Sequence, residues 1–196
     1  MTQGRPRAFD GETALEQALL AFWQHGYDAT SITVLTEAMG INASSLYAAF
    51  GDKRSLFTAA VRRYLQGPAR FTTMALEGTP TAREAVERLL RAAAVTYTAP
   101  GHPPGCLVIS AATNCTPGSL DVQAELRDIR AQGRQALTQR ITAGIVAREM
   151  PPETDAHALA AFYAATLQGM SGLARDGSTH AELDHVATAA LAAWPG

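Results

Sequence analysis

The sequence contains little cysteine and no long apolar run. Its 196 residues include two cysteines, Cys106 and Cys115, which are too few for a disulfide framework and fit a reducing, cytoplasmic setting. No stretch approaches the roughly 18 consecutive apolar residues that a membrane-spanning helix needs. The polar, basic segment at residues 3–7 is followed by no apolar run, so we expect no secretory signal. These absences exclude a disulfide-rich secreted domain and predict a protein without a membrane partner.

An excess of positive charge is missing as well. The chain holds 16 Lys and Arg residues against 18 Asp and Glu residues, which gives a formal net charge of -2. Residues 1–66 are balanced, because their cations (Arg5, Arg7, Lys53, Arg54, Arg62 and Arg63) are matched by Asp10, Glu12, Glu16, Asp28, Glu37 and Asp52. Nucleic-acid binding would therefore depend on where a few cations are placed, not on bulk charge.

Strand signals are scarce, whereas helical periodicity is nearly continuous and 47% of the residues are hydrophobic. The pattern predicts an all-α protein of about nine helices, with three small helices at the N-terminus and a larger bundle after them. The longest expected helices cover roughly residues 52–76, 120–148, 155–175 and 179–194, and Gly67–Pro68 is expected to kink or break the first of these. We place the domain boundary between residues 1–52 and 53–196.

The most informative segment is residues 30–53. Ile32, Leu35 and Met39 have helical spacing, Gly40 suits a helix end, and Asn42 suits the N-cap of a second helix. The first turn of that second helix carries small and hydroxyl residues, which suits insertion into a DNA major groove. The pattern favours a helix-turn-helix over an ordinary helical hairpin. The expected DNA contacts are Thr30, Thr33, Asn42, Ala43, Ser44, Ser45, Tyr47 and Lys53, with Arg5 and Arg7 reaching an adjacent minor groove.

Several segments together resemble the TetR/AcrR family of transcriptional regulators. The matching stretches are residues 4–10 (GRPRAFD), 22–27 (FWQHGY), 30–32 (TSI) and 39–57, with weaker likeness at 105–108 (GCLV), 167–170 (LQGM) and 192–195 (AAWP). The resemblance implies an all-helical homodimer, a palindromic double-stranded DNA operator and a small-molecule effector in the larger domain. It also implies repression that the effector relieves.

The chain departs from the family pattern on its second helix-turn-helix helix. Ala43 and Ala49 stand where larger polar residues are often found, and an alanine can only touch a thymine methyl. Direct base readout is therefore expected to rest on Ser44 and Ser45. Arg5 and Arg7 would supplement this readout by sensing the shape of the minor groove.

Two further sets of residues are candidates in the larger domain. An effector cavity is expected among Phe71, Met74, Tyr97, Phe162, Tyr163 and Met170, each of which is also an ordinary core residue type. No charged residue lies between Asp155 and Arg175, so that helix is expected to be buried nearly all round. The expected dimer interface comprises Ala160, Ala164, Gly169, Leu183, Val186, Leu191 and Trp194.

Other chemistry finds little support. His180 and His185 do not share a helix face well, and no set of residues with zinc-ligand spacing accompanies them, so we expect no metal and no cofactor. Cys106 lies in an apolar stretch of the sequence, where a thiol is usually unreactive. The chain lacks a nucleotide-binding loop and a nucleophile elbow, which disfavours an enzyme. A helical small-molecule-binding protein and a protein-only regulator without DNA binding stay open, as do the effector, the operator, the direction of regulation and any redox role of the cysteines.

Overall fold

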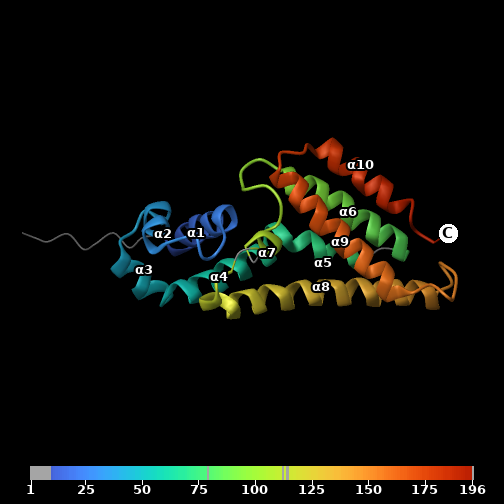
Figure 1. Cartoon of the computed structure of the whole chain (residues 1–196), viewed down its shortest axis with the longest axis horizontal. Coiled ribbons are helices and arrows are strands. Elements are labelled where there is room, and N and C mark those ends of the chain that lie inside the picture. Colours follow the sequence, from blue (N-terminus) through green and yellow to red (C-terminus); the bar gives the residue numbers. More distant parts are fainter. Residues whose placement is uncertain (1–9, 79, 112, 114, 196) are drawn as a thin grey trace, which may run out of the picture.

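The computed structural model describes residues 10–78, 80–111, 113 and 115–195 (Figure 1). In these ranges all regular structure is helical, with ten α-helices and two short 3-10 helices. The α-helices are α1 (Gly11–His25), α2 (Ile32–Met39), α3 (Ala43–Phe50), α4 (Lys53–Gln66), α5 (Phe71–Leu76), α6 (Ala82–Thr98), α7 (Leu107–Ser110), α8 (Leu120–Val146), α9 (Ala156–Arg175) and α10 (His180–Leu191). The 3-10 helices are η1 (Pro68–Arg70) and η2 (Pro117–Ser119). The all-helical prediction is confirmed.

The extra helix arises at the break expected at Gly67. Residues 52–76 form α4, η1 and α5 in place of one helix, because Pro68 has no N–H to continue the hydrogen-bonding ladder. The N–H of Gly67 closes α4 by donating to the carbonyl of Arg63 at 2.9 Å. This break lets the chain turn from the N-terminal end of the molecule into the bundle.

The molecule is elongated, as Figure 1 shows. Helices α1 to α3 lie at one end, α6, α9 and α10 lie at the other, and α8 runs from beside α4 along the base of the bundle. Helix α4 leads from α3 toward the bundle and packs on α1. The larger domain is thus attached to the N-terminal end through two long helices, α4 and α8.

Side-chain caps define the N-terminal helices. The side chain of Ser31 accepts a hydrogen bond at the start of α2, that of Asn42 accepts one from the Ser45 N–H at 2.8 Å, and that of Asp52 caps α4. Gly40 ends α2 in the left-handed conformation, with φ 65° and ψ 29°. These contacts confirm the helix-turn-helix boundaries that the sequence indicates.

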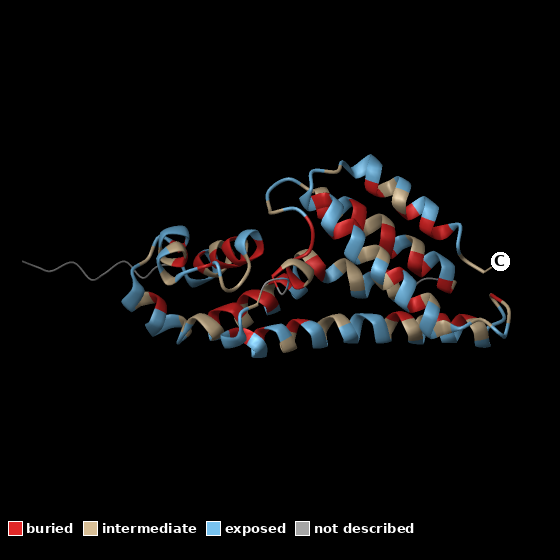
Figure 2. Ribbon diagram, in the orientation of Figure 1, coloured by how far each residue is buried: buried red, intermediate tan, exposed pale blue. Residues whose placement is uncertain are grey.

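The buried residues form one continuous core that extends through both ends (Figure 2). At the N-terminal end the core is aromatic, and Phe22, Trp23, Phe57 and Tyr64 are all fully buried. In the bundle it is richer in alanine and leucine. Gly105 lets the segment before α7 lie against α9, because its φ is +79° and an added Cβ would come within 2.7 Å of the Ser171 carbonyl oxygen.

Candidate DNA-binding interface and effector cavity

Helix α3 presents the expected surface. Ala43, Ser44 and Tyr47 are exposed, Ser45 is half-buried, and Leu46 is fully buried beneath them. Tyr47 keeps 48% of its surface exposed although it is a large aromatic residue. The exposed side is therefore short, polar and free to approach DNA, and the buried side fixes it on the core. Asn42 is exposed too, but its side-chain oxygen is occupied by the cap of α3.

The placement of Thr30 corrects one expected phosphate contact. Thr30 is fully buried, and its hydroxyl donates to the carbonyl of Gly26 at 2.5 Å. It therefore stabilises the turn between α1 and α2 and has no surface for a phosphate. Thr33, one turn into α2, is exposed as expected.

Lys53 lies at the first position of α4, next to the end of α3. Its ammonium nitrogen stands 4.3 Å from the centroid of the Tyr27 ring, which holds the side chain near the helix-turn-helix by a cation–π contact. Partial burial lowers the pKa of Lys53, and the nearby charge of Asp28 opposes that effect. Arg5 and Arg7, the expected minor-groove contacts, lie outside the described residues.

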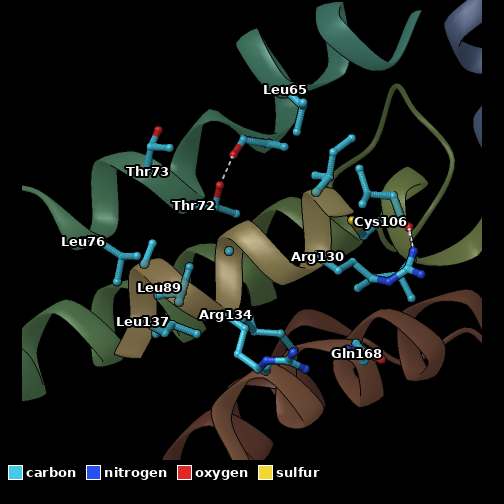
Figure 3. Close-up of a pocket in the computed structure, with 18 of the residues that line it drawn as sticks. Leu65, Thr72, Thr73, Leu76, Leu89, Cys106, Arg130, Arg134, Leu137 and Gln168 are labelled. Carbon is cyan, nitrogen blue, oxygen red and sulfur yellow. Dashed lines mark hydrogen bonds between the residues drawn. The ribbon is translucent and has the colours of Figure 1, made fainter. Parts of the chain in front are cut away.

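The larger domain contains a partly open cavity of about 520 Å³ (Figure 3). Side chains from α4, α5, α6, α7, α8 and α9 contribute to its wall. Its apolar lining includes Leu65, Leu76, Leu89, Ile129 and Leu137. The volume is in the range typical of small-molecule sites.

Of the six residues expected in this cavity, only Tyr97 lines it. Phe71 packs edge-on against Tyr97, with ring centroids 6.0 Å apart, but is not part of the wall. Met74 and Phe162 point to the surface, with 54% and 42% of their areas exposed. The remaining two, Tyr163 and Met170, are fully buried in the packing of α9, where the Tyr163 hydroxyl donates to the carbonyl of Ala190.

The sequence reasoning missed most of the wall because it singled out aromatic and methionine residues. The decisive signal is on α8, where the apolar series of Leu126, Ile129 and Leu137 is interrupted by Arg130 and Arg134. Gly133 lies between the two arginines and leaves room on the same face. An interruption of this kind on a core-facing helix is a sign of a lined cavity.

Polar groups gather at one end of the cavity. Cys106 is held there by its backbone N–H, which donates to the Ser171 hydroxyl at 2.9 Å. The hydroxyls of Tyr64 and Tyr97 both lie near the Cys106 thiol. Burial raises the pKa of Cys106, so the thiol stays protonated and weakly nucleophilic. Burial also raises the pKa of Tyr64 well above its ordinary value.

The described residues contain no group of three or more His, Cys, Asp or Glu side chains that is placed to hold a metal ion. Both cysteines are free thiols. Burial raises the pKa of Cys115 as it does that of Cys106.

Polar links join the N-terminal end to the larger domain. Arg54 of α4 forms ion pairs with Asp121 at 2.5 Å and Glu125 at 2.6 Å, both on α8. The carboxylate of Asp28, in the turn after α1, accepts hydrogen bonds from the Thr116 N–H and the Ser119 hydroxyl. The ring of Trp23 meets that of Tyr64 edge-on at 4.8 Å, so α1 touches a residue of the cavity wall.

The expected dimer residues divide into buried and accessible groups. Ala160, Leu183 and Leu191 are buried inside the protomer, which corrects their assignment to an interface. Ala164 lines the cavity, Val186 and Trp194 are half-buried, and Gly169 is exposed.

Within one chain helix α9 keeps an exposed side, so its burial nearly all round, which was expected for a dimer, stays a prediction. Phe162 and Leu173 are 42% and 41% exposed, and they share the outward side of α9 with exposed Ala161, Ala165, Gly169 and Gly172. An apolar, uncharged helix side of this kind is unusual next to water.

Comparison with known proteins matches both ends of this structure. The family model for bacterial regulatory proteins of the tetR family matches residues 14–60, and the model for the tetracyclin repressor-like C-terminal domain matches residues 82–190. The HTH-type transcriptional repressor ComR of Escherichia coli (strain K12) is 35% identical over 195 residues, which cover 99% of this chain and 93% of ComR. The chain belongs to the TetR family.

Other TetR-family relatives agree. The HTH-type transcriptional repressor BdcR of the same E. coli strain is 33% identical over 189 residues, covering 96% of this chain and 90% of BdcR. A solved structure shows a cysteine-substituted mutant of the TetR family transcriptional regulator CifR complexed with 26-base-pair double-strand operator DNA. That chain is 42% identical and superposes with a TM-score of 0.93 over 98% of this chain and 100% of its own length. These relatives are named as transcriptional regulators.

No helix among the described residues is long and apolar enough to cross a membrane.

Proposed function

We propose that this TetR-family chain is a transcriptional repressor that binds a palindromic operator as a homodimer and releases it when a small molecule fills the cavity. The observation that carries the proposal is the likeness to operator-bound CifR, with a TM-score of 0.93 across nearly the whole chain. The proposal places the protein with DNA in the cytoplasm and gives it no catalytic role.

Each part of the DNA-binding end has a task in this proposal. Helix α3 enters the major groove, where Ser44 and Ser45 meet base edges. Thr33, Tyr47 and Lys53 meet the phosphates on either side and set the register of the protein on the duplex. The two arm arginines reach the flanking minor groove.

The outward side of α9 supplies the dimer contact. Its small residues permit close approach of a second copy, and Phe162 and Leu173 provide apolar area that pairing removes from water. A two-fold dimer places two copies of α3 about 34–36 Å apart, the spacing of successive major grooves on one side of the duplex.

Release follows from the cavity's position beside α4. Tyr64 belongs to α4, lines the cavity and packs on Trp23 of α1. A ligand that binds better when α4 is displaced would shift the population toward that state. The displacement would carry α1 and α3 with it and move the two reading helices off their groove spacing.

The proposal is tested by fluorescence anisotropy with labelled DNA from the promoter beside the chain's own gene. We expect two chains to bind one palindromic site, and we expect a scrambled duplex of equal length to bind at least about a thousandfold more weakly at physiological salt. Equal affinity for both duplexes would contradict a repressor. It would favour the other candidates, a small-molecule-binding protein or a regulator that acts through protein contacts alone.

A further inference from the structure

The Tyr64 hydroxyl is a buried polar group without a partner. Its side chain is fully buried, and its oxygen makes no hydrogen bond of acceptable geometry with any described residue, although the Cys106 thiol lies nearby. Tyr64 also forms part of the cavity wall. Leaving a hydroxyl buried and unsatisfied costs free energy, so a ligand atom that accepts from it would bind there with a gain.

The same end of the cavity carries positive charge that is not neutralised. Arg130 is half-buried and donates to the carbonyl oxygen of Val108 at 2.6 Å, but it forms no ion pair with a described residue. Arg134 lies one helical turn farther along α8, at the exposed edge of the cavity, and its guanidinium forms no ion pair with a described residue. Figure 3 shows both side chains extending from α8, with Arg130 reaching the end where Cys106 lies.

Two like charges at positions i and i+4 of a helix repel one another. Among the described residues of the wall Glu77 is the single carboxylate, and neither Arg130 nor Arg134 forms an ion pair with it. A half-buried guanidinium without an acidic partner is a binding position for a carboxylate, because charge-assisted hydrogen bonds are the strong ones.

Away from this end the wall is largely apolar, although Thr72, Thr73, Glu77, Gln139, Arg140 and Gln168 also line the cavity. Leu89 and Leu137 are almost fully buried, and Ile129 and Leu167 are partly buried and pack against the core. These aliphatic side chains offer no hydrogen bonds and suit a hydrocarbon chain or ring. The arrangement is therefore amphipathic, with a cationic and hydroxyl-bearing end and an apolar body.

We propose that the effector is an organic monocarboxylate with an apolar body, whose carboxylate accepts hydrogen bonds from Arg130 and Tyr64. Arg134 adds its charge at the edge of the cavity, and the apolar body lies against Leu89 and Leu137. This inference rests on the proposed function, since it names the ligand class of the same cavity. The binding is reversible and non-covalent, in keeping with a protonated Cys106 thiol.

The experiment titrates the full chain with octanoate by calorimetry and uses octan-1-ol as the matched neutral probe. We expect octanoate to bind at least about tenfold more tightly than octan-1-ol, the minimum that one charge-assisted contact supplies. Octanoate is also expected to release labelled operator DNA in the anisotropy assay. Equal affinity for the acid and the alcohol would overturn the proposal.

Three variants assign the effect to the polar end. Tyr64→Phe removes an oxygen that has no partner in the described structure, so the fold is retained and octanoate affinity falls. Arg130→Met lowers octanoate affinity about tenfold or more and leaves the affinity for octan-1-ol unchanged. Arg127→Met is the control, because Arg127 is exposed on the same helix and is not part of the wall.

The outcomes separate this inference from the proposed function. Two results would leave the chain a repressor with another ligand class, provided that it binds its operator. The first is an equal response to acid and alcohol. The second is full octanoate affinity in both Tyr64→Phe and Arg130→Met. A chain that binds octanoate with the expected variant pattern but ignores its operator supports the ligand class and contradicts repression.

Discussion

The cores at the two ends of the molecule are built from different side chains. At the DNA-binding end the rings of Phe22 and Phe57 meet edge-on at 5.0 Å, Trp23 and Tyr64 do so at 4.8 Å, and all four side chains are fully buried. The larger domain leaves about 520 Å³ open between its helices beside Tyr64, and a second hollow of about 450 Å³ lies where the end of α1 and the turn after it meet α7 and α9. A dense aromatic core moves as one body, whereas a domain with internal space can change shape when the space is filled. We infer from this difference that the chain is rigid at the proposed DNA-reading end and adaptable at the proposed ligand site.

The first prediction concerns the truncation of one core side chain at each end of the molecule. Phe57→Ala is expected to cost about 3–5 kcal/mol of the free energy of unfolding, because it removes a ring enclosed by Phe22 and Tyr27. Leu89→Ala should cost about 2 kcal/mol, at the low end for such a change, since Leu89 borders the cavity. Urea unfolding followed by circular dichroism measures both values. Equal losses would mean that the two ends are packed alike.

The second prediction concerns the outward side of α9. Gly169→Arg introduces a bulky charge where an added Cβ meets nothing within 4 Å, so the protomer folds normally. We expect sedimentation to show monomers, and operator affinity to fall at least about a hundredfold because each half-site then binds alone. Ala131→Arg, at an exposed position of α8, is the control and should remain dimeric. A dimeric Gly169→Arg variant would place the interface elsewhere.

The third prediction tests base readout by α3. Ser44→Ala removes an exposed hydroxyl and is expected to relax preference at one or two operator positions, by about 1–3 kcal/mol for a good contact. Competition with duplexes that carry single base changes measures the pattern. A loss that is uniform over all sequences would assign Ser44 to the phosphate backbone.

The fourth prediction concerns Lys53. Lys53→Ala is expected to weaken specific and non-specific DNA by similar factors and to lower the slope of log affinity against log salt by about one unit. Arg62→Ala, at an exposed position nearer the other end of α4, should leave the slope unchanged. An unaltered slope for Lys53→Ala would show that its charge serves only the Tyr27 ring.

Local signals explain why the DNA-binding end was predictable. Caps such as Ser31, Asn42 and Asp52 act within three residues of their own position, so the sequence alone indicates where α2, α3 and α4 begin. The predicted phosphate contact of Thr30 was wrong because of tertiary packing. In the folded turn the Thr30 hydroxyl donates a hydrogen bond to the carbonyl of Gly26. Burial of that kind depends on how α1 and α2 pack.

The cavity could not be predicted in the same way. Tyr64, Tyr97, Cys106 and Arg130 come from α4, α6, the residue before α7, and α8, and only the packing of these elements brings them together. Helical periodicity indicates which side of each helix is apolar but not how the sides meet. Phe162 is an example. Its place on the apolar stripe of α9 suggests that it lines the cavity, but the orientation of the helix in the bundle turns its side chain outward.

The last and smallest expected effect lies where the two ends meet. The hydrogen bond from the Ser119 hydroxyl, followed by that from the Thr116 N–H, lowers the pKa of Asp28. A carboxyl whose pKa is lower in the folded chain stabilises the fold above its unfolded pKa of about 3.9, and this contribution is lost as the pH falls through the folded value. Asp28→Asn should therefore lower the melting temperature slightly at pH 7, and the difference from the unsubstituted chain should shrink toward pH 3. The effect stays small because solvent screens this carboxylate.

Ser119→Ala identifies the partner in that link. If the Ser119 hydroxyl holds the carboxylate, the double variant with Asp28→Asn loses less stability than the sum of the two single changes. Additive losses, or a difference that persists unchanged at pH 3, would show that Asp28 acts through packing rather than charge. Because this contact joins the turn after α1 to the start of α8, non-additivity would also show that the rigid end and the adaptable end are energetically connected there.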